Sequence, residues 1–359
     1  MPSTGLPTQA SALDSKPQVT AERQEFYQRI GERSATPLWE VLSDIVTPEP
    51  RTGCVPAIWR YREMRPFLME AGRLITAKEA ERRVLVLENP GARGESRITG
   101  TLYAGMQLVL PGEIAPTHRH AASALRFVLE SDGGYTAVEG ERITMRPNDF
   151  ILTPSWTYHD HGNPGNGPVT WLDGLDIPLI NALATSFAEH YPEETQPVTK
   201  NQHDSLARYG ANMLPVEYVS TRKSSPVVHY PYERSRETIH QLYRNGPVDP
   251  VHGAKMQFAN PATGGSPMPT IGAFLQLLPA GFQGSAYRST DATVFCVAEG
   301  SGRTQIGGRN YDWEAHDVFV VPSWCPVAHQ ADGESVLFSF SDRPVQKALG
   351  VWRDQTGPA

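Results

Sequence analysis

Two short segments of the 359-residue chain hold four of its eleven histidines. His118 and His120 stand two residues apart in "PTHRHAASALRF", and His159 and His161 stand two residues apart in "PSWTYHDHGN". Residues i and i+2 of an extended strand point to the same side, so each pair can face one point inside a barrel. Neutral imidazoles bind iron, copper, nickel and zinc. One such pair is a weak signal, because surface or core use is the commoner reading, but the second pair strengthens the case for a metal site. Three histidines would also suit a hydrolytic zinc site.

An internal repeat indicates which part of the chain should carry this site. Residues 134–156 align without a gap with residues 302–324, and the same register extends backwards over more than forty residues in all. The matched positions include Gly134 with Gly302, Gly140 with Gly308, Asp149 with Asp317, and Trp156 with Trp324. In the second copy the positions of His118, His120 and His159 hold Ala286, Arg288 and Val327, and only His161 has a counterpart, His329. The scaffold is repeated and the histidine cluster is not, which favours a functional use of the first copy.

The elements expected to position the histidines are short strands. Segments such as "ALRFVLE", "ERITM" and "DFILTP" are rich in β-branched and aromatic residues and are separated by Gly, Pro, Asn or Asp. This pattern predicts a mainly β chain of two antiparallel barrels or jelly rolls from a duplicated domain. Helical patterns cover residues 21–33, 36–46, 178–191 and 235–246, and residues 218–232 are typical of a polar surface linker. The expected organisation is a disordered tail over 1–20, an N-terminal helical region over 21–80, a first barrel with the metal site over 81–180, a linker with helices over 181–265, and a second barrel lacking the metal triad over 266–359.

Composition narrows the class of partner. The net charge of -7 argues against nucleic acid or an anionic membrane as the main partner. The sequence has no apolar run of about 18 residues and no secretory start. The three cysteines are odd in number and far apart, which indicates a reducing compartment and a cytoplasmic protein.

Two motifs resemble those of a known superfamily. "GEIAPTHRH" and "PSWTYHDHGN" resemble the two metal motifs of the cupins. The two-copy layout, with "WLDGLDIPL" and "NPATGGSPMPTIGAFLQLLPAGF", resembles the gentisate 1,2-dioxygenase family of bicupins, whose relatives include salicylate 1,2-dioxygenases and 1-hydroxy-2-naphthoate dioxygenases. Many cupins have a metal-binding glutamate about four residues after the second histidine; "AASAL" has none here, and the gentisate branch shares that absence.

The resemblance implies an activity and a cofactor. It implies one Fe(II) per chain, held by His118, His120 and His159, in an extradiol-type dioxygenase of aromatic catabolism that converts gentisate and O2 to maleylpyruvate. Three neutral ligands leave the full +2 charge on the metal, which favours an anionic chelating substrate. The resemblance also implies a homotetramer, with the second barrel used in packing or assembly. The alternatives are a salicylate or 1-hydroxy-2-naphthoate 1,2-dioxygenase and, in another class, a non-catalytic cupin that binds a metal or a small acid.

Further side chains are candidates for contact with the substrate. Arg126 interrupts an apolar strand where the second copy has Val294, and an arginine that points into the barrel is suited to binding a carboxylate, with an outward-facing arginine on a half-exposed strand as the alternative. His161 should face the same cavity as His159 and form hydrogen bonds to substrate or an oxygen intermediate, with a satisfied histidine at the barrel rim as the alternative. Three residues share one face of the strand "YAGMQLVLP", with core packing as the alternative: Tyr103, Gly105 and Gln107. Arg82 and Asp173 match family positions near the pocket, although the sequence alone favours a surface charge or ion pair for each.

Overall fold

The computed structural model of the chain describes residues 19–357, so the predicted tail over residues 1–20 lies almost entirely outside the described part. Contacts within the chain divide it after residue 50. The first unit contains two helices, α1 (Ala21–Gly31) and α2 (Leu38–Ile45), close to the predicted spans. The hydroxyl of Thr20 caps α1 by accepting a hydrogen bond from the backbone N–H of Arg23. Within residues 19–357, no helix is both long and apolar enough to cross a membrane.

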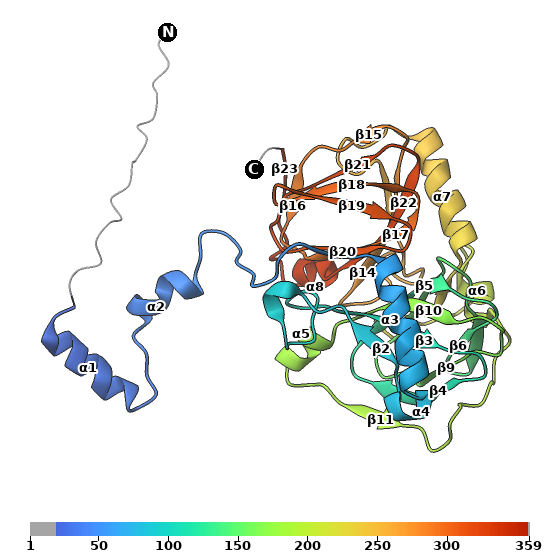
Figure 1. The fold of residues 1–359 in the computed structure, drawn as a ribbon, viewed down its shortest axis with the longest axis horizontal. Helices are drawn as coiled ribbons and strands as arrows, with labels where there is room; N and C mark the ends of the chain where they lie inside the picture. Colours follow the sequence, from blue (N-terminus) through green and yellow to red (C-terminus); the bar gives the residue numbers. More distant parts are fainter. Residues whose placement is uncertain (1–18, 358–359) are drawn as a thin grey trace, which may run out of the picture. The chain divides into compact units, whose positions relative to one another are not determined.

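The first barrel consists of two antiparallel sheets (Figure 1). One sheet has the order β12 (His229–Tyr230), β8 (Phe150–Thr153), β5 (Ala124–Glu130), β10 (Val169–Leu175), β3 (Tyr103–Val109) and β2 (Val84–Val86). The facing sheet has the order β11 (Ala188–His190), β4 (Ile114–His120), β9 (His159–Gly162), β6 (Tyr135–Val138) and β7 (Glu141–Thr144). Both pairs of histidines therefore lie on neighbouring strands, β4 and β9.

The second barrel repeats this plan. Its first sheet has the order β1 (Ala57–Trp59), β20 (Val318–Val321), β17 (Thr293–Glu299), β22 (Ser335–Ser341), β14 (Gly272–Leu278) and β13 (Ala254–Gln257). The other sheet has the order β19 (Arg309–Glu314), β18 (Ser301–Ile306), β21 (Val327–Ala331), β16 (Tyr287–Ser289) and β23 (Asp354–Thr356), with β15 (Phe282–Gln283) also paired to β21. The prediction of a mainly β chain with two barrels is confirmed.

The aligned sequence positions also share backbone conformation. Trp156 and its counterpart Trp324 both have a φ of 62°, a value that bulky residues adopt rarely. Gly140 and Gly308 both have a φ of 80°, where the absence of a Cβ removes the steric penalty. The repeated sequence therefore adopts the same turns in both barrels.

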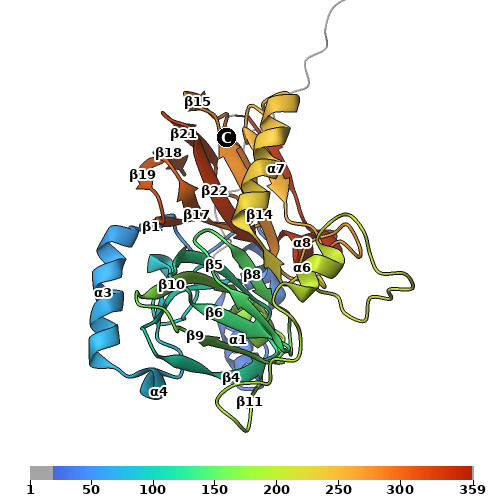
Figure 2. The same cartoon turned by 90° about the vertical axis from the view of Figure 1, so that its right-hand side faces the viewer.

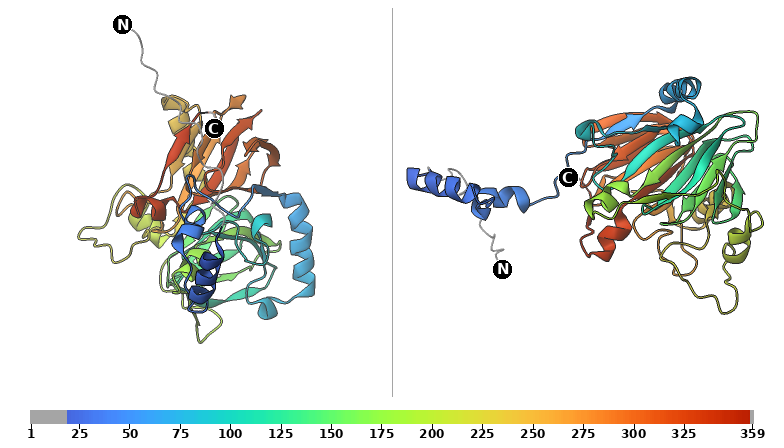
Figure 3. Two further views of the ribbon diagram at one scale, coloured as in Figure 1. Left: turned by 90° about the vertical axis from the view of Figure 1, so that its left-hand side faces the viewer. Right: turned by 90° about the horizontal axis from the view of Figure 1, so that it is seen from below.

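Each barrel takes its outermost strand from the segment that leads into the other barrel. Strand β1 precedes the first barrel in sequence but pairs with β20 of the second, and β12 precedes the second barrel but pairs with β8 of the first. Each strand is followed by a 14-residue helix, α3 (Tyr61–Leu74) or α7 (Tyr232–Asn245). Figure 2 shows these two helices against different barrels, and Figure 3 shows α3 along the outside of the first.

Buried carboxylates hold the exchanged strands in place by accepting hydrogen bonds from the backbone that follows them. Asp317 of the second barrel accepts a hydrogen bond from the backbone N–H of Tyr61 at 2.8 Å, and Asp149 of the first barrel accepts one from Tyr232 at 2.8 Å. The ring of Phe127 stacks on that of Phe338 across the two barrels, with centroids 4.3 Å apart. One apolar core extends through both barrels. The two barrels are therefore held together by reciprocal strand exchange and by a shared core.

Two segments differ from the prediction. The prediction of a helix over 178–191 is wrong for its second half. The helix α5 covers Ile177–Ala182, and residues 188–190 instead form strand β11, which pairs with the edge of β4. The segment 218–232 is not a surface linker throughout, because Val227, Val228 and His229 are buried and β12 pairs with β8. The remaining short helices are α4 (Ala77–Ala80), η1 (Pro90–Ala92), α6 (Asp204–Tyr209) and α8 (Arg343–Ala348).

Candidate active site

Three histidines of the first barrel converge on one point. His118 and His120 lie on β4 and His159 lies on β9, where His118 and His159 are directly paired in the strand register. The ring centroids are 4.5 Å apart for His118 and His159, 4.9 Å for His120 and His159, and 5.3 Å for His118 and His120. One nitrogen from each ring lies within 4.8 Å of the others. The barrel thus builds a three-nitrogen cluster from the residues that the sequence singled out.

Hydrogen bonds orient two of these rings for metal binding. Nδ1 of His120 lies 2.7 Å from the carbonyl oxygen of Ala122, and Nδ1 of His159 lies 3.0 Å from that of Thr157. A carbonyl only accepts hydrogen bonds, so these Nδ1 atoms carry protons and each Nε2 keeps a free lone pair. Burial lowers the pKa of His120 to about 4 and that of His159 well below its ordinary value. Both rings are therefore neutral at physiological pH.

The third ring has a different partner. Nη2 of Arg82 lies 2.6 Å from Nδ1 of His118 and 2.6 Å from the carbonyl oxygen of Pro116. A guanidinium only donates hydrogen bonds, so Nδ1 of His118 accepts and Nε2 carries the proton of the neutral ring. Burial lowers the pKa of His118 to about 2. Neither nitrogen then has a free lone pair, so Arg82 would have to move away for His118 to bind a metal.

The donor set fits a divalent transition metal. Among residues 19–357 these three histidines are the one cluster of three or more His, Cys, Asp or Glu side chains arranged to hold a metal ion, and it contains no carboxylate. The neighbouring Asp160 is held by Thr117 and Gln196 instead. Three neutral nitrogens suit iron or zinc and leave further coordination positions free.

A buried ion pair lies in the same barrel. Arg126 on β5 and Asp173 on β10 are paired in the register, and Nε of Arg126 lies 3.8 Å from Oδ1 of Asp173. Nη1 of Arg126 donates to the hydroxyl of Thr153, and the indole N–H of Trp171 donates to Asp173 at 2.8 Å. Burial raises the pKa of Asp173 to about 6, and the positive charge of Arg126 opposes that rise. Arg126 is therefore an inward-facing cation, as the sequence predicted, and Asp173 is its partner.

Two buried polar side chains in this region have unused hydrogen-bonding groups. Both ring nitrogens of His161 and the amide Nε2 of Gln107 lack a partner among the described residues. The ring of His161 lies 5.0 Å from that of Trp171 and 5.8 Å from that of His159, and Trp171 is paired with Gln107 in the register. Buried polar groups are normally satisfied, so unused ones beside the histidine cluster indicate a place for a polar ligand.

The strand face beneath them is shaped by a glycine. Gly105 lies between Tyr103 and Gln107 on β3 and faces Asp173 in the register. A Cβ at Gly105 would lie 2.4 Å from a methyl carbon of Val84 and 2.8 Å from the hydroxyl of Tyr103. The glycine thus allows Tyr103 to reach over the strand towards the site.

The structure places all ten candidate residues in the first barrel or, for Arg82, at its edge. Sequence reasoning missed Thr153 and Trp171, which hold Arg126 and Asp173 in place. The alternation within "WLDGLDIPL", which puts Trp171 and Asp173 on one face of a strand, is the signal that could have indicated Trp171.

Comparisons with known proteins agree with this geometry. A family model described as the cupin domain matches residues 105–175. The chain is 56% identical over 343 residues to gentisate 1,2-dioxygenase 1 of Aquipseudomonas alcaligenes, covering 96% of this chain and 99% of that protein. It is 36% identical to 5-aminosalicylate 1,2-dioxygenase of Comamonas sp., covering 92% and 89% of the two chains. It superposes with a TM-score of 0.90, at 33% identity and 97% coverage of each chain, on the crystal structure of salicylate 1,2-dioxygenase from Pseudoaminobacter salicylatoxidans with adducts of gentisate.

Proposed function

Because the chain belongs to the gentisate 1,2-dioxygenase family of cupin proteins, we propose that it is an iron(II)-dependent enzyme that opens the ring of gentisate with O2 to give maleylpyruvate. The family and the enzyme class predicted from the sequence are confirmed by the relative that is 56% identical to the chain. The observation that carries the proposal is the cluster of His118, His120 and His159, formed in one of two otherwise repeated barrels beside the buried cation Arg126.

Iron(II) is the proposed metal, and the three histidines would hold it. When bound, iron(II) supplies the positive charge that attracts a chelating hydroxy acid and the redox chemistry that lets O2 react with an aromatic ring. The absence of a carboxylate from the cluster is consistent with an anionic ligand, because no negative charge of the protein competes for the metal.

Side chains of the barrel would bind and orient the acid. Nε of Arg126 is buried without a hydrogen-bond partner among the described residues, so the guanidinium is available for the substrate carboxylate, while Thr153 and Asp173 keep it in position. Arg82, displaced from His118 when that ring becomes a ligand, is a second donor for the same carboxylate. Neutral His161 offers one N–H and one lone pair to a ring hydroxyl of the substrate.

The experiment that tests the proposal is oxygen uptake by protein loaded anaerobically with Fe(II). Gentisate, salicylate and 1-hydroxy-2-naphthoate would be offered in parallel, because relatives act on hydroxy acids other than gentisate. Rapid uptake with gentisate and little with the other two is the expected result. Comparable uptake with all three would favour a broader salicylate-type enzyme, and no uptake at stoichiometric iron would contradict a dioxygenase.

Replacing one ligand tests the assignment of the metal site. We expect His159→Ala to lose bound iron and oxygen uptake together, because two imidazoles and no carboxylate remain. His240→Ala, which removes a histidine on α7 near Glu334, is the matched control and should retain both. Full iron content and turnover in His159→Ala would show that the ligand set is wrong.

We also propose that the chain assembles as a homotetramer, as the sequence resemblance implies. Helix α2 exposes apolar side chains that a monomer would leave in water, with Leu38 55% exposed, Trp39 60% and Ile45 66%. Sedimentation of the full chain should give a tetramer, and Trp39→Asp should weaken it. A monomer at micromolar concentration would contradict this assembly.

A further inference from the structure

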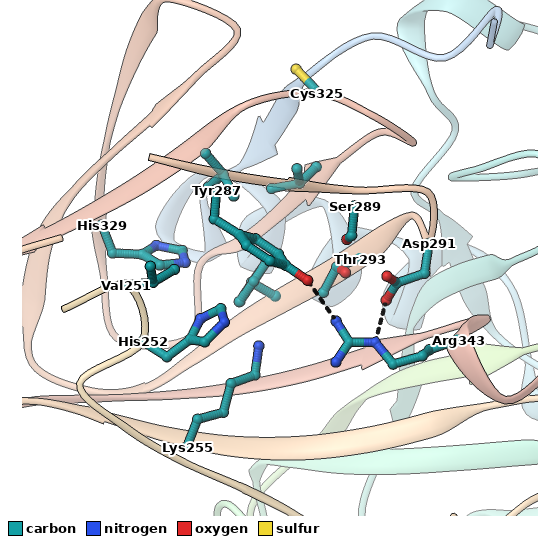
Figure 4. A pocket seen from close by; sticks show the side chains of 13 residues that line it. Val251, His252, Lys255, Tyr287, Ser289, Asp291, Thr293, Cys325, His329 and Arg343 are labelled. Atoms are coloured by element: carbon teal, nitrogen blue, oxygen red, sulfur yellow. Dashed lines mark hydrogen bonds and ion pairs between the residues drawn. The ribbon is translucent and has the colours of Figure 1, made fainter. Parts of the chain in front are cut away.

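The second barrel has an internal cavity of its own (Figure 4). Its wall comes from both sheets of that barrel, including β13, β16, β17 and β21. The polar groups around it are mostly donors of hydrogen bonds: His252, Lys255, Tyr287, Ser289, Thr293, His329 and Arg343, with Asp291 as the lining carboxylate. The cavity therefore lies in the copy that lacks the metal triad and is lined by fixed cations.

Lys255 is the most unusual of these groups. Its ammonium forms no hydrogen bond or ion pair with any residue in the described part of the chain, and it lies 5.2 Å from the ring of Phe274 and 5.8 Å from that of Phe295. Figure 4 shows its side chain extending towards His252 and Tyr287. Lys255 is half-buried, and a cation partly removed from water without a counter-ion is destabilised, so it either loses its proton or acquires an anion.

The lining carboxylate is already used elsewhere. Asp291 accepts from Nε of Arg343 at 3.1 Å and from the indole N–H of Trp352 at 2.7 Å. Nη2 of Arg343 also reaches the hydroxyl of Tyr287 at 3.5 Å. Of the two lining cations, Arg343 is thus paired and Lys255 is not, which leaves the cavity with an excess of one positive charge when Lys255 is protonated.

His329 contributes a further donor. Its Nδ1 lies 2.8 Å from the hydroxyl of Thr304, which also accepts from the indole N–H of Trp313 at 2.9 Å. The hydroxyl proton of Thr304 has no other acceptor among the described residues, so it is donated to Nδ1 of His329. Burial lowers the pKa of His329 to about 3, so the ring is neutral and its Nε2 carries the remaining proton. His329 can therefore donate to a ligand but cannot act as a metal ligand in this tautomer.

We propose that the second barrel binds one small monovalent anion, of the size of chloride or formate, between Lys255, His329 and the pair of Tyr287 and Arg343. The cavity offers about 20 Å³ to the centres of water-sized groups, room for about one or two of them, so an aromatic acid is too large. The anion would neutralise Lys255 and accept the free N–H of His329. The two barrels would then both attract anions, the first through a metal and the second through fixed side chains.

The charge state of Lys255 provides a distinctive signature. Burial and nearby Arg343 lower its pKa to about 7, against the opposing effect of Asp291 and Asp249. Of the other titratable groups lining the cavity, His252 and His329 are neutral, each with a pKa lowered to about 3. The pKa values of Tyr287 and Cys325 are raised and that of Asp291 is lowered, so Lys255 is the group that titrates near neutral pH. Anion affinity should therefore fall about 50-fold between pH 7 and pH 9, because only the protonated amine attracts the ligand.

The test is a titration of the full metal-loaded chain with sodium formate and, separately, with sodium chloride. Sodium gluconate, whose anion is too large for the cavity, keeps the ionic strength constant. We expect calorimetry to give one saturable site per chain and the melting temperature to rise with its occupancy. Lys255→Met should abolish that site, and Lys347→Met, which removes an exposed lysine of the same barrel, should retain it.

Two further arms separate this site from the first barrel. His159→Ala, which lacks the metal triad, should still bind the anion, whereas binding that disappears with the triad would place it at the metal and overturn the proposal. If Lys255→Met does not fold, the wild-type affinity at pH 7 and pH 9 decides, because binding without pH dependence would also overturn it. The absence of saturable binding of both anions at 100 mM would have the same meaning.

Discussion

Replacing Arg126 with methionine should weaken capture of the substrate while the metal stays bound. Methionine keeps the apolar stem in the core and removes the guanidinium, whose Nη1 is held by Thr153 and whose Nε has no hydrogen-bond partner among the described residues. One hydrogen bond to a charged group contributes about 1.5–3 kcal/mol. Since 1.4 kcal/mol corresponds to a factor of ten, kcat/KM for gentisate should fall about 10- to 150-fold.

The same change should alter Asp173. Burial already raises the pKa of this carboxyl to about 6 with Arg126 opposing, so without the guanidinium the pKa rises further and Asp173 is neutral at pH 7. A carboxyl with a raised folded pKa binds its proton more tightly in the folded state, so stability falls as pH rises from about 4 through that pKa. In the variant this loss of stability should continue to higher pH than in the wild type.

The assay combines steady-state oxygen uptake over a range of gentisate concentrations with iron analysis per chain. Arg119→Met is the matched control, because Arg119 lies on the strand of the histidine ligands but pairs with Glu189 and packs over Trp156 on the other face. A kcat/KM of Arg126→Met within about threefold of the wild type would refute the carboxylate role. Loss of iron in proportion to activity would refute the separation of substrate binding from metal binding.

Three other outcomes are expected. His161→Phe should keep its iron but lose at least about tenfold in turnover, as measured by iron analysis and oxygen uptake, because a ring of similar shape loses both hydrogen-bonding nitrogens. In anion-free buffer, Lys255→Met should be more stable than the wild type by at most about 5 kcal/mol at pH 7 and below, because the pKa of Lys255 is lowered from 10.5 to about 7 in the folded chain. This gain in stability should vanish near pH 10.5, and denaturant titrations at several pH values would measure it. Asp317→Ala should lower the free energy of unfolding by about 2–4 kcal/mol, because the backbone N–H of Tyr61 loses its buried acceptor. The control, Asp312→Ala at an exposed position, should lower it by less than about 0.5 kcal/mol in the same denaturant titration.

The residues of the histidine cluster could be identified without coordinates because the signal is local. Two histidines at i and i+2 of a strand share a face whatever the rest of the chain does, as His118 and His120 show. The repeat added the comparison between copies, and its turns at Trp156 and Trp324 have the same backbone conformation. The alternation of side chains along a strand and the internal repeat are both properties of the sequence, so they can be recognised without a structure.

The contacts made by long-range pairing could not be read in the same way. The strand at residues 188–190 has a sequence compatible with a helix, and the open edge of β4 decides its conformation. Nothing local to β1 indicates that it joins the second barrel rather than the first. Such choices depend on which edges and buried acceptors are left free once the sheets have formed.

The duplicated barrels, the cluster of three histidines and the inward-facing Arg126 can be inferred from the order of residues along the chain. Only the folded chain shows that Arg82 contacts Nδ1 of His118, that Asp173 is the partner of Arg126, and that Lys255 lines a cavity with no ion pair among residues 19–357. The physical reason is that a side chain's face follows from its own strand, whereas its partner and its degree of desolvation depend on residues that the fold brings from distant parts of the chain.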